Sequence, residues 1–293
     1  MTYDVVVRNG VVVLPEWEGP RRLDLGITDG RVAALLEPGE GDAREQEWDA
    51  GGHVVLPGAI DPHVHVNWPY LEERTVDDYA SASRAAARGG TTTIVDFAIE
   101  GRQDPLAAVL TRRDQAAGAS VVDFSLHCVV SDTSERVMEC LKDVVAAGVT
   151  SFKVYTTYRR RGLAMGPDGI AAVASAVARY GGVLCVHAEA ADNDQEDCEE
   201  LRRRGLGAAR FLPVAKPPSV EATAVTMAAE AVARGGGHLS ILHLSSAQGL
   251  AAANRARGRW GQPEALETCP HYLLLDRTRL EGDAGQRYLC SPP

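Results

Sequence analysis

Four histidines occur at spacings that could build a metal site. His63 and His65 form a His-x-His pair, and His187 and His243 follow in two later apolar stretches. Because side chains alternate along a strand, His63 and His65 would point to the same face and could bind one metal ion together. Imidazoles that converge without acidic partners suit zinc or a neighbouring transition metal. The pattern therefore predicts a site for a zinc-like ion.

A lysine stands in the middle of a segment that otherwise predicts a strand. Lys153 lies within TSFKVYTTY, residues 150–158, among β-branched and aromatic residues. A buried ammonium is costly unless it is paired, deprotonated or chemically changed. The role of Lys153 must therefore follow from what surrounds it in the fold.

Apolar strand candidates alternate with alanine-rich helix candidates from residue 55 onward, which predicts a parallel sheet with helices outside it. We expect an α/β fold, a (β/α)8 TIM-type barrel, which has eight strands and places active residues at their carboxyl ends. The sequence ends after the seventh unit, so the expectation is a barrel truncated before strand 8. The alternative is an open doubly wound sheet, although no Gly-x-Gly-x-x-Gly follows the first strand. The seven expected strands are residues 53–66, 91–98, 122–130, 150–158, 182–189, 238–246 and 266–276.

The first 54 residues differ, because short β-branched runs are separated there by turn signals. Asn9–Gly10 and Asp29–Gly30 lie between such runs, and these dipeptides are strong hairpin signals. The segment predicts a small antiparallel β module, the N-terminal portion of a β-sandwich. The expected domains are therefore a β-sandwich portion over residues 1–54 and the barrel over residues 55–293.

The composition argues against several classes of function. With 30 Lys and Arg against 40 Asp and Glu, the formal net charge is −10, which disfavours nucleic acid or an anionic membrane as a partner. No apolar run approaches the roughly 20 residues of a membrane span, and the N-terminus lacks a signal-peptide pattern. The six cysteines form no Cys-x-x-Cys pair, as expected of a reduced, cytoplasmic protein.

Five segments resemble the successive signatures of the cyclic amidohydrolases. They are GAIDPHVHV, FKVYTTY, VHAE, LHLSS and ETCPHYLLLD, and they occur in the family's order. This family contains hydantoinases, dihydropyrimidinases, allantoinases and dihydroorotases. The resemblance covers nearly the whole chain, and it implies an enzyme that hydrolyses an amide bond in a small cyclic substrate.

The resemblance implies a role for each residue of the candidate site. His63 and His65 would bind one divalent metal ion, and His187 and His243 would bind a second, with zinc expected for both. Lys153 would bridge the ions as a carbamate formed with CO2, because two dications repel an ammonium and stabilise an anionic oxygen donor. A hydroxide bridging the two metals would then attack the amide carbonyl.

In the family, a carboxylate from the eighth strand also binds metal and moves a proton to the leaving nitrogen. No counterpart precedes the end of the sequence at Pro293. We therefore expect the gene product to be longer, and the 293-residue chain alone to be inactive or poorly soluble. The alternative of another class is a catalytically inactive truncated scaffold. The resemblance also implies a homo-oligomer, either a dimer or a tetramer.

The positions that distinguish the branches of the family by substrate point to two of these branches. Asn67 stands where dihydroorotases have an arginine that binds the substrate carboxylate, and HVHVNWP resembles the allantoinase pattern. SFKVYTTY resembles hydantoinases and dihydropyrimidinases, in which a tyrosine in the place of Tyr158 binds the substrate. Ser291 resembles a serine whose backbone contacts the cyclic diamide, and Asn67 is the third expected substrate contact. A hydantoinase-like activity is favoured, with an allantoinase as the alternative.

Other polar residues have supporting or structural interpretations. Asp61, next to the His-x-His pair, is expected to orient a metal-binding histidine. His127, within the third expected strand, and Asp96, near the end of the second, are interpreted as buried structural groups. The cysteines lack a histidine partner for nucleophilic catalysis and are interpreted as packing residues.

Overall fold

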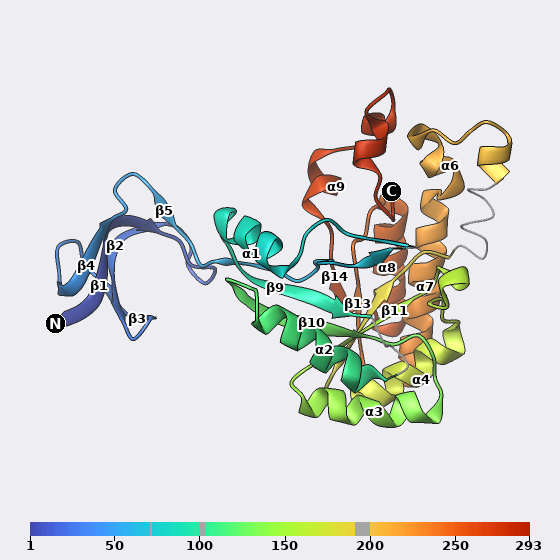
Figure 1. Ribbon diagram of the computed structural model, residues 1–293, viewed down its shortest axis with the longest axis horizontal. Coiled ribbons are helices and arrows are strands. Elements are labelled where there is room, and N and C mark those ends of the chain that lie inside the picture. The colour runs from blue at the N-terminus through green and yellow to red at the C-terminus, as the bar shows by residue number, and fades with distance from the viewer. Residues whose placement is uncertain (71, 100–103, 191–199) are drawn as a thin grey trace. The chain divides into compact units, whose positions relative to one another are not determined.

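The chain divides into two compact units. The computed structural model describes residues 1–70, 72–99, 104–190 and 200–293, and Figure 1 shows its elements. The smaller unit consists of Met1–Ile60 and Gly90–Thr92, and the larger of Asp61–Gly89 and Thr93–Pro293. A five-stranded sheet lies in the smaller unit, and a seven-stranded sheet lies mainly in the larger one.

The sheet of the smaller unit has the order β3-β2-β1-β4, and β5 also pairs with β1. The pairs β1–β2 and β2–β3 are antiparallel, whereas β1 pairs in parallel with β4 and β5. The expectation of a purely antiparallel module is therefore wrong, and the described strands of this unit form one mixed sheet. They are β1 (Thr2–Val12), β2 (Arg21–Thr28), β3 (Arg31–Leu36), β4 (Asp42–Asp49) and β5 (Val54–Val55).

Only one of the two predicted hairpin turns in this unit is present. Asp29 and Gly30 both have positive φ, 52° and 69°, and join the antiparallel strands β2 and β3 as predicted. Asn9 also has a positive φ of 59°, but it lies inside β1, where the register against β2 shifts between Val7 and Gly10. The Asn-Gly signal therefore marks a β-bulge, because one left-handed residue can bend a strand without reversing it.

The seven-stranded sheet of the described residues has the order β14-β13-β12-β11-β10-β9-β6. Its strands pair in parallel from β9 to β14, as the strand–helix alternation predicts. Seven strands were expected in this part of the fold, and the count is confirmed. The strands are β6 (Ala59–Asp61), β9 (Thr91–Ala98), β10 (Asp123–Val129), β11 (Ser151–Tyr155), β12 (Val183–His187), β13 (His238–Ile241) and β14 (Ala265–Leu266).

Several strands are shorter than the sequence predicts. β6 ends at Asp61, so His63 and His65 lie in the irregular segment beyond it rather than within a strand. β14 has two residues, and Pro270 begins a short helix where the expected strand continued. A proline cannot donate to a strand ladder but suits the first turn of a helix, which explains the change.

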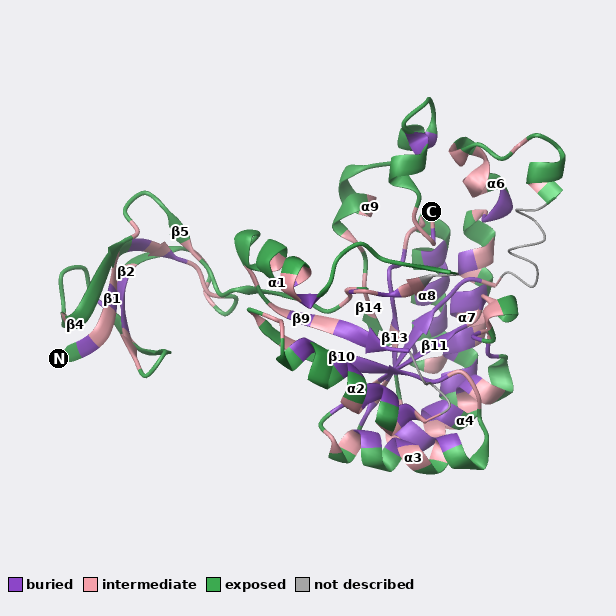
Figure 2. Cartoon of the chain, in the orientation of Figure 1, coloured by how far each residue is buried: buried purple, intermediate pink, exposed green. Residues whose placement is uncertain are grey.

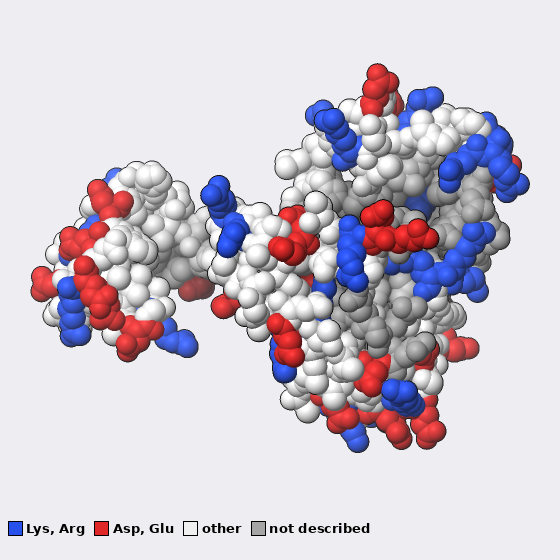
Figure 3. Space-filling view, in the orientation of Figure 1, with Lys and Arg blue, Asp and Glu red and all other residues white. Residues whose placement is uncertain are grey.

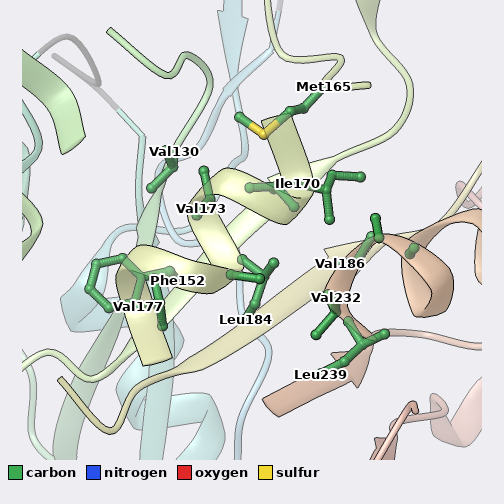
Figure 4. Close-up of a cluster of buried hydrophobic side chains, with 14 of the residues drawn as sticks. Val130, Phe152, Met165, Ile170, Val173, Val177, Leu184, Val186, Val232 and Leu239 are labelled. Atoms are coloured by element: carbon green, nitrogen blue, oxygen red, sulfur yellow. The ribbon is translucent and has the colours of Figure 1, made fainter. Parts of the chain in front are cut away.

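Helices cover the seven-stranded sheet, and the main hydrophobic core lies between the helices and the sheet. Figure 2 shows the strands of this sheet mostly buried and the outer surfaces of the helices exposed. In Figure 4, Phe152 and Leu184 of the sheet lie near Ile170 and Val173 of α4, all within one buried cluster. The helices are α1 (Tyr79–Arg88), α2 (Pro105–Ala117), α3 (Glu135–Ala146), α4 (Pro167–Ala178), α6 (Leu212–Ala215), α7 (Pro218–Gly235), α8 (Ala247–Trp260) and α9 (Pro270–Leu274).

Short elements complete the larger unit. The pair β7 (Pro69–Tyr70) and β8 (Glu73–Arg74) forms a small antiparallel ribbon after the His-x-His segment. Acidic and basic side chains both occur over the face shown in Figure 3. Among the described helices, none combines the length and the apolar character needed to cross a membrane. The 3-10 turns are η1 (Arg159–Arg161), η2 (Ala209–Phe211), η3 (Arg277–Leu280) and η4 (Gly285–Tyr288).

Candidate metal centre

The four histidines predicted to bind metal lie together in the larger unit. The ring centroids of His63 and His65 are 5.2 Å apart, and those of His63 and His243 are 5.1 Å apart. His187 lies 4.5 Å from His243, again between ring centroids. Two of these residues follow β6, one ends β12 and one follows β13, so the curled sheet brings distant segments into one cluster.

Lys153 lies in the middle of β11 and is 1% exposed. Its Nζ is 4.8 Å from the ring centroid of Tyr155 and 5.3 Å from that of Phe97. Among the described residues it forms no ion pair with a carboxylate. Burial lowers the pKa of Lys153 to about 7, although Cys185 and Glu267 oppose the shift. The site therefore disfavours an ammonium at this position.

Three residues of the predicted site have left-handed backbone conformations. The φ angles are 44° for Asn67, 66° for Tyr158 and 37° for His243. Such angles are uncommon for residues other than glycine, cost roughly 1–3 kcal/mol each, and persist where the surroundings fix them. All three residues lie just beyond strands or in the segment after β6, where the chain turns into the site.

Glu267 is a member of the site whose role was not predicted from the sequence. Its Oε1 lies 2.6 Å from Nδ1 of His63 and accepts a 3.1 Å hydrogen bond from the backbone N–H of His243. His63 follows β6 and Glu267 follows β14, which are the two outer strands of the sheet. The sheet is therefore curled far enough for residues beyond its two edges to touch. The signal for Glu267 was its place directly after the seventh strand, within the quoted motif ETCPHYLLLD.

Glu189 and Lys216, for which the sequence motifs predicted no role, form a buried ion pair next to His187. The Glu189 carboxylate lies 2.8 Å from Nζ of Lys216 through Oε1 and 2.9 Å from Nε2 of His187 through Oε2. Burial alone would raise the pKa of Glu189, but the hydrogen bond and charge of His187 and the charge of Lys216 lower it to about 2. Glu189 follows His187 by two residues in VHAE, a position that points to the same side of an extended chain.

Two predicted substrate contacts meet beside this ion pair. The hydroxyl of Tyr158 donates a 3.0 Å hydrogen bond to Oγ of Ser291, from a residue 133 positions away. Oγ of Ser291 also accepts a 2.7 Å hydrogen bond from Nζ of Lys216 and donates one of 3.2 Å to Oε2 of Glu189. A polar network therefore links Tyr158 and Ser291 to His187 through Glu189.

Asn67 and Asp61 hold the segment around the His-x-His pair. The backbone N–H of Asn67 donates to the carbonyl of Asp77, and its own carbonyl accepts from the Arg74 side chain at 3.0 Å. Asp61 accepts a 3.0 Å hydrogen bond from the backbone N–H of His63. Asp61 thus contacts the His63 backbone, whereas the carboxylate on the imidazole ring is that of Glu267.

His127 and Asp96 are buried structural groups, as predicted. The His127 ring contacts Oγ of Ser151 at 2.7 Å and the carbonyl of Pro62 at 2.9 Å. Asp96 is fully buried, accepts a 2.6 Å hydrogen bond from the Tyr79 hydroxyl, and lies 2.6 Å from the guanidinium of Arg112. Since these polar atoms have protein partners, the two residues support the fold around the site.

The imidazoles of the cluster are held in their neutral form. Burial lowers the pKa of His187 to about 4, and burial followed by the charges of its neighbours lowers that of His243 well below its usual range. His65 keeps an exposed surface, yet loss of water around its ring and the charge of His63 lower its pKa in the same direction. A neutral imidazole is the form that binds metal.

The residues present fit a divalent metal centre. Nδ1 of His243 is buried without a hydrogen-bond partner among the described residues, and such an orphaned nitrogen is suited to a metal. His63 and His187 each use one ring nitrogen for a carboxylate, which leaves the other available. Within the described ranges, no three His, Cys, Asp or Glu side chains are already arranged to bind one metal ion. The histidine side chains of the cluster would therefore have to adjust when metal binds.

Comparison with known proteins gives one consistent family. Residues 54–250 match the Amidohydrolase family. The chain is 34% identical to the D-hydantoinase of Ralstonia pickettii over 293 residues, covering 99% of this chain and 63% of that enzyme. It is 35% identical to the D-hydantoinase of Streptomyces coelicolor over 301 residues, covering 100% of this chain and 63% of that enzyme.

Solved structures give the same result. A crystal structure of a D-hydantoinase matches with a TM-score of 0.92 and 31% identity, over 98% of this chain and 62% of that one. A dihydropyrimidinase from Brevibacillus agri matches with a TM-score of 0.91 and 32% identity, over 98% and 62%. The chain thus spans less than two thirds of the length of these relatives. It belongs to the amidohydrolase family, in the branch that contains hydantoinases and dihydropyrimidinases.

Proposed function

We propose that this chain carries the metal centre of a cyclic amidohydrolase that opens a hydantoin or dihydropyrimidine ring. The observation that carries the proposal is the meeting of four neutral imidazoles with a buried lysine that has no described acidic partner. Lys153 lies close enough for its charge to add to the effect of burial in lowering the pKa of all four histidines. Burying these polar side chains in an apolar core without partners would be costly, whereas divalent metal ions would bind their free nitrogen atoms. The hydantoinase and dihydropyrimidinase relatives support the reaction type.

In this proposal His63 and His65 would hold one divalent ion, and His187 and His243 would hold a second, with zinc as the expected metal. Lys153 would be a ligand shared by both ions, as a carbamate formed when its neutral amine nitrogen adds to the carbon of CO2 and releases a proton. Burial favours that reaction because it keeps the amine in its neutral, nucleophilic form. When bound, the ions supply Lewis acidity, which acidifies water and polarises a carbonyl.

The chain's own residues position the cyclic amide. Tyr158 and Ser291 meet in one hydrogen-bond network. The Tyr158 hydroxyl donates within that network and keeps acceptor capacity for a ring N–H of a cyclic diamide, and the backbone of Ser291 is the second proposed contact. Asn67 lies on the segment after the His-x-His pair and is the third proposed contact. The buried Glu189–Lys216 pair binds the Ser291 hydroxyl, which would fix the position of the Ser291 backbone before substrate arrives.

Two finer assignments follow from the same relatives and composition. The relatives are hydantoinases and a dihydropyrimidinase, which favours their substrates over allantoin. The cysteines in the described residues are free thiols, which fits a reducing, cytoplasmic setting. As the sequence resemblance implies, we also propose a homo-oligomer.

The direct test compares substrates and metal content in one preparation of the full-length gene product. Hydantoin, dihydrouracil and allantoin are supplied side by side, and bound metal is counted by elemental analysis. The proposal expects two equivalents of divalent metal and turnover of one of the first two compounds. His187→Ala should lose metal and turnover, whereas His238→Ala is the matched control, because His238 lies at the start of β13 and is paired with Glu264 on the surface. Metal-free protein, or turnover that His187→Ala leaves intact, would refute the proposal.

A further inference from the structure

Glu267 contacts two of the proposed metal ligands with a single oxygen atom. Oε1 lies 2.6 Å from Nδ1 of His63 and 3.1 Å from the backbone nitrogen of His243. His63 belongs to the proposed first metal and His243 to the second. One carboxylate oxygen therefore contacts both halves of the centre.

The backbone of Glu267 is fixed on the neighbouring strand. Its N–H donates to the carbonyl of Ile241 at 2.8 Å, and its carbonyl accepts from the N–H of Leu244 at 2.7 Å. These bonds continue the β13–β14 pairing past the end of both strands. The side chain is thus aimed by regular backbone bonding, and it meets His63 across 204 positions of sequence.

The contact determines which nitrogen of His63 carries the proton. An ionised carboxylate can only accept hydrogen bonds, so the partner Nδ1 must be the donor and Nε2 the nitrogen with a free lone pair. A metal binds through that lone pair. The second contact acts on the other half of the centre. His243 has a strained φ of 37°, and the hydrogen bond from its backbone N–H to Glu267 helps to hold that conformation.

We propose that Glu267 is a positioning residue that sets the His63 tautomer and holds the His243 turn, so that both halves of the metal centre are preorganised. The proposal rests on the proposed metal-dependent function. Glu267 acts through the two histidines and is assigned no contact with substrate. It also couples the outer strands of the sheet, since His63 follows β6 and Glu267 follows β14.

The chain contains a matched control for this pair. His238 and Glu264 also lie 2.6 Å apart, between a histidine of β13 and a glutamate just before β14. Their side chains are 57% and 48% exposed, against 12% and 17% for His63 and Glu267. The same residue types at the same distance therefore occur once on the surface and once in the proposed centre.

The test compares Glu267→Ala and Glu267→Gln with Glu264→Ala in the full chain. The first readout is the tautomer of His63 in the metal-free protein, from the nitrogen chemical shifts of ¹⁵N-labelled histidine. The second is affinity for Co²⁺, followed by its visible absorption and by competition with a chelator. Circular dichroism confirms that each variant is folded. Neither readout depends on turnover.

We expect wild-type His63 to carry its proton on Nδ1, and Glu267→Ala to give a mixture of tautomers. Affinity for Co²⁺ should fall by about 10–100-fold in Glu267→Ala, the range for removing a carboxylate that orients a metal-binding histidine. Glu267→Gln keeps an acceptor oxygen but loses the charge, so its loss should be smaller, and Glu264→Ala should match wild type.

Wild-type affinity and an unchanged His63 tautomer in Glu267→Ala would overturn the inference. If Glu267→Ala does not fold, Glu267→Gln is the deciding variant. A Co²⁺ affinity of Glu267→Gln equal to that of Glu264→Ala would then overturn the inference. Failure of the proposed function gives a different result. The wild type would then bind Co²⁺ and lose affinity through Glu267→Ala, yet hydrolyse neither hydantoin nor dihydrouracil.

Discussion

Two buried lysines, Lys153 and Lys216, lie in the larger unit in contrasting surroundings. Lys153 is 1% exposed and faces aromatic rings and imidazoles, with no described acidic partner. Lys216 is 8% exposed, pairs with the Glu189 carboxylate at 2.8 Å and donates to Oγ of Ser291 at 2.7 Å. The third lysine of the sequence, Lys142, is exposed on α3.

The contrast separates a permanent charge from a reactive amine. Lys216 has the partners that a buried ammonium needs, so its charge is a fixed part of the structure. Lys153 lacks them, and its environment favours the neutral amine, the form that can react with CO2. Burial alone therefore does not identify a catalytic lysine, whereas burial without a counter-charge does point to one.

The largest effect is expected from Lys153→Ala in the metal-loaded protein. Loss of the proposed bridging ligand should lower turnover of the ring substrate by more than about 1,000-fold, because removal of even a partner of a metal ligand costs about 10–100-fold. Metal content per chain should fall with it, as measured by elemental analysis. Added acetate or propionate should restore part of both. A variant that keeps two metals and full turnover would contradict the role of Lys153.

Lys216→Met should destabilise the metal-free protein by about 3–5 kcal/mol, because it leaves the buried Glu189 charge without its ammonium partner. Urea unfolding at neutral pH measures the change. Lys142→Met is the control and should alter the free energy of unfolding by no more than about 0.5 kcal/mol, since that side chain is exposed. Equal changes in the free energy of unfolding for Lys216→Met and Lys142→Met would show that the buried ion pair does not stabilise the fold.

A double-mutant cycle isolates the ion pair itself. Glu189→Gln alone leaves the Lys216 charge unpaired, whereas Lys216→Met with Glu189→Gln removes both charges. The double variant should therefore be more stable than the sum of the single effects by about 1–3 kcal/mol. The same unfolding measurement in metal-free protein gives the coupling energy. Additive effects would show that the two charges do not stabilise each other.

The smallest effect is expected from Lys153→Met in the metal-free protein. Met fills a similar apolar volume and removes a buried amine that has no described counter-charge, so stability should stay within about 1 kcal/mol of wild type or increase. Urea unfolding without metal tests this. A loss comparable to that of Lys216→Met would mean that Lys153 has a stabilising partner in the fold.

Much of the fold could be predicted from the sequence because the strand–helix alternation is regular. The order of seven strands and the buried positions of His187 and Lys153 follow from apolar segments and their ends. Element lengths were less predictable. His63 and His65 lie beyond β6, and they face one another because the segment after the strand is held by other contacts, among them Asp61 on the His63 backbone.

The partners of the metal ligands could not be predicted, because they depend on tertiary contacts. Glu267 contacts His63 only because the sheet is curled. Lys216 lies directly after α6 and contacts Glu189 from there. Local signals misled in a similar way at Asn9–Gly10, where a strong turn dipeptide forms a bulge inside β1. In each case pairing across the fold outweighed the local pattern.

The contact between His63 and Glu267 also has a consequence for the order of folding. It joins residues separated by 204 positions, so nearly the whole larger unit must be synthesised before it can form. Closing so long a loop is entropically unfavourable until the intervening strands have paired. We therefore expect the metal centre to be completed late, and metal uptake during refolding to lag behind the recovery of helical circular dichroism.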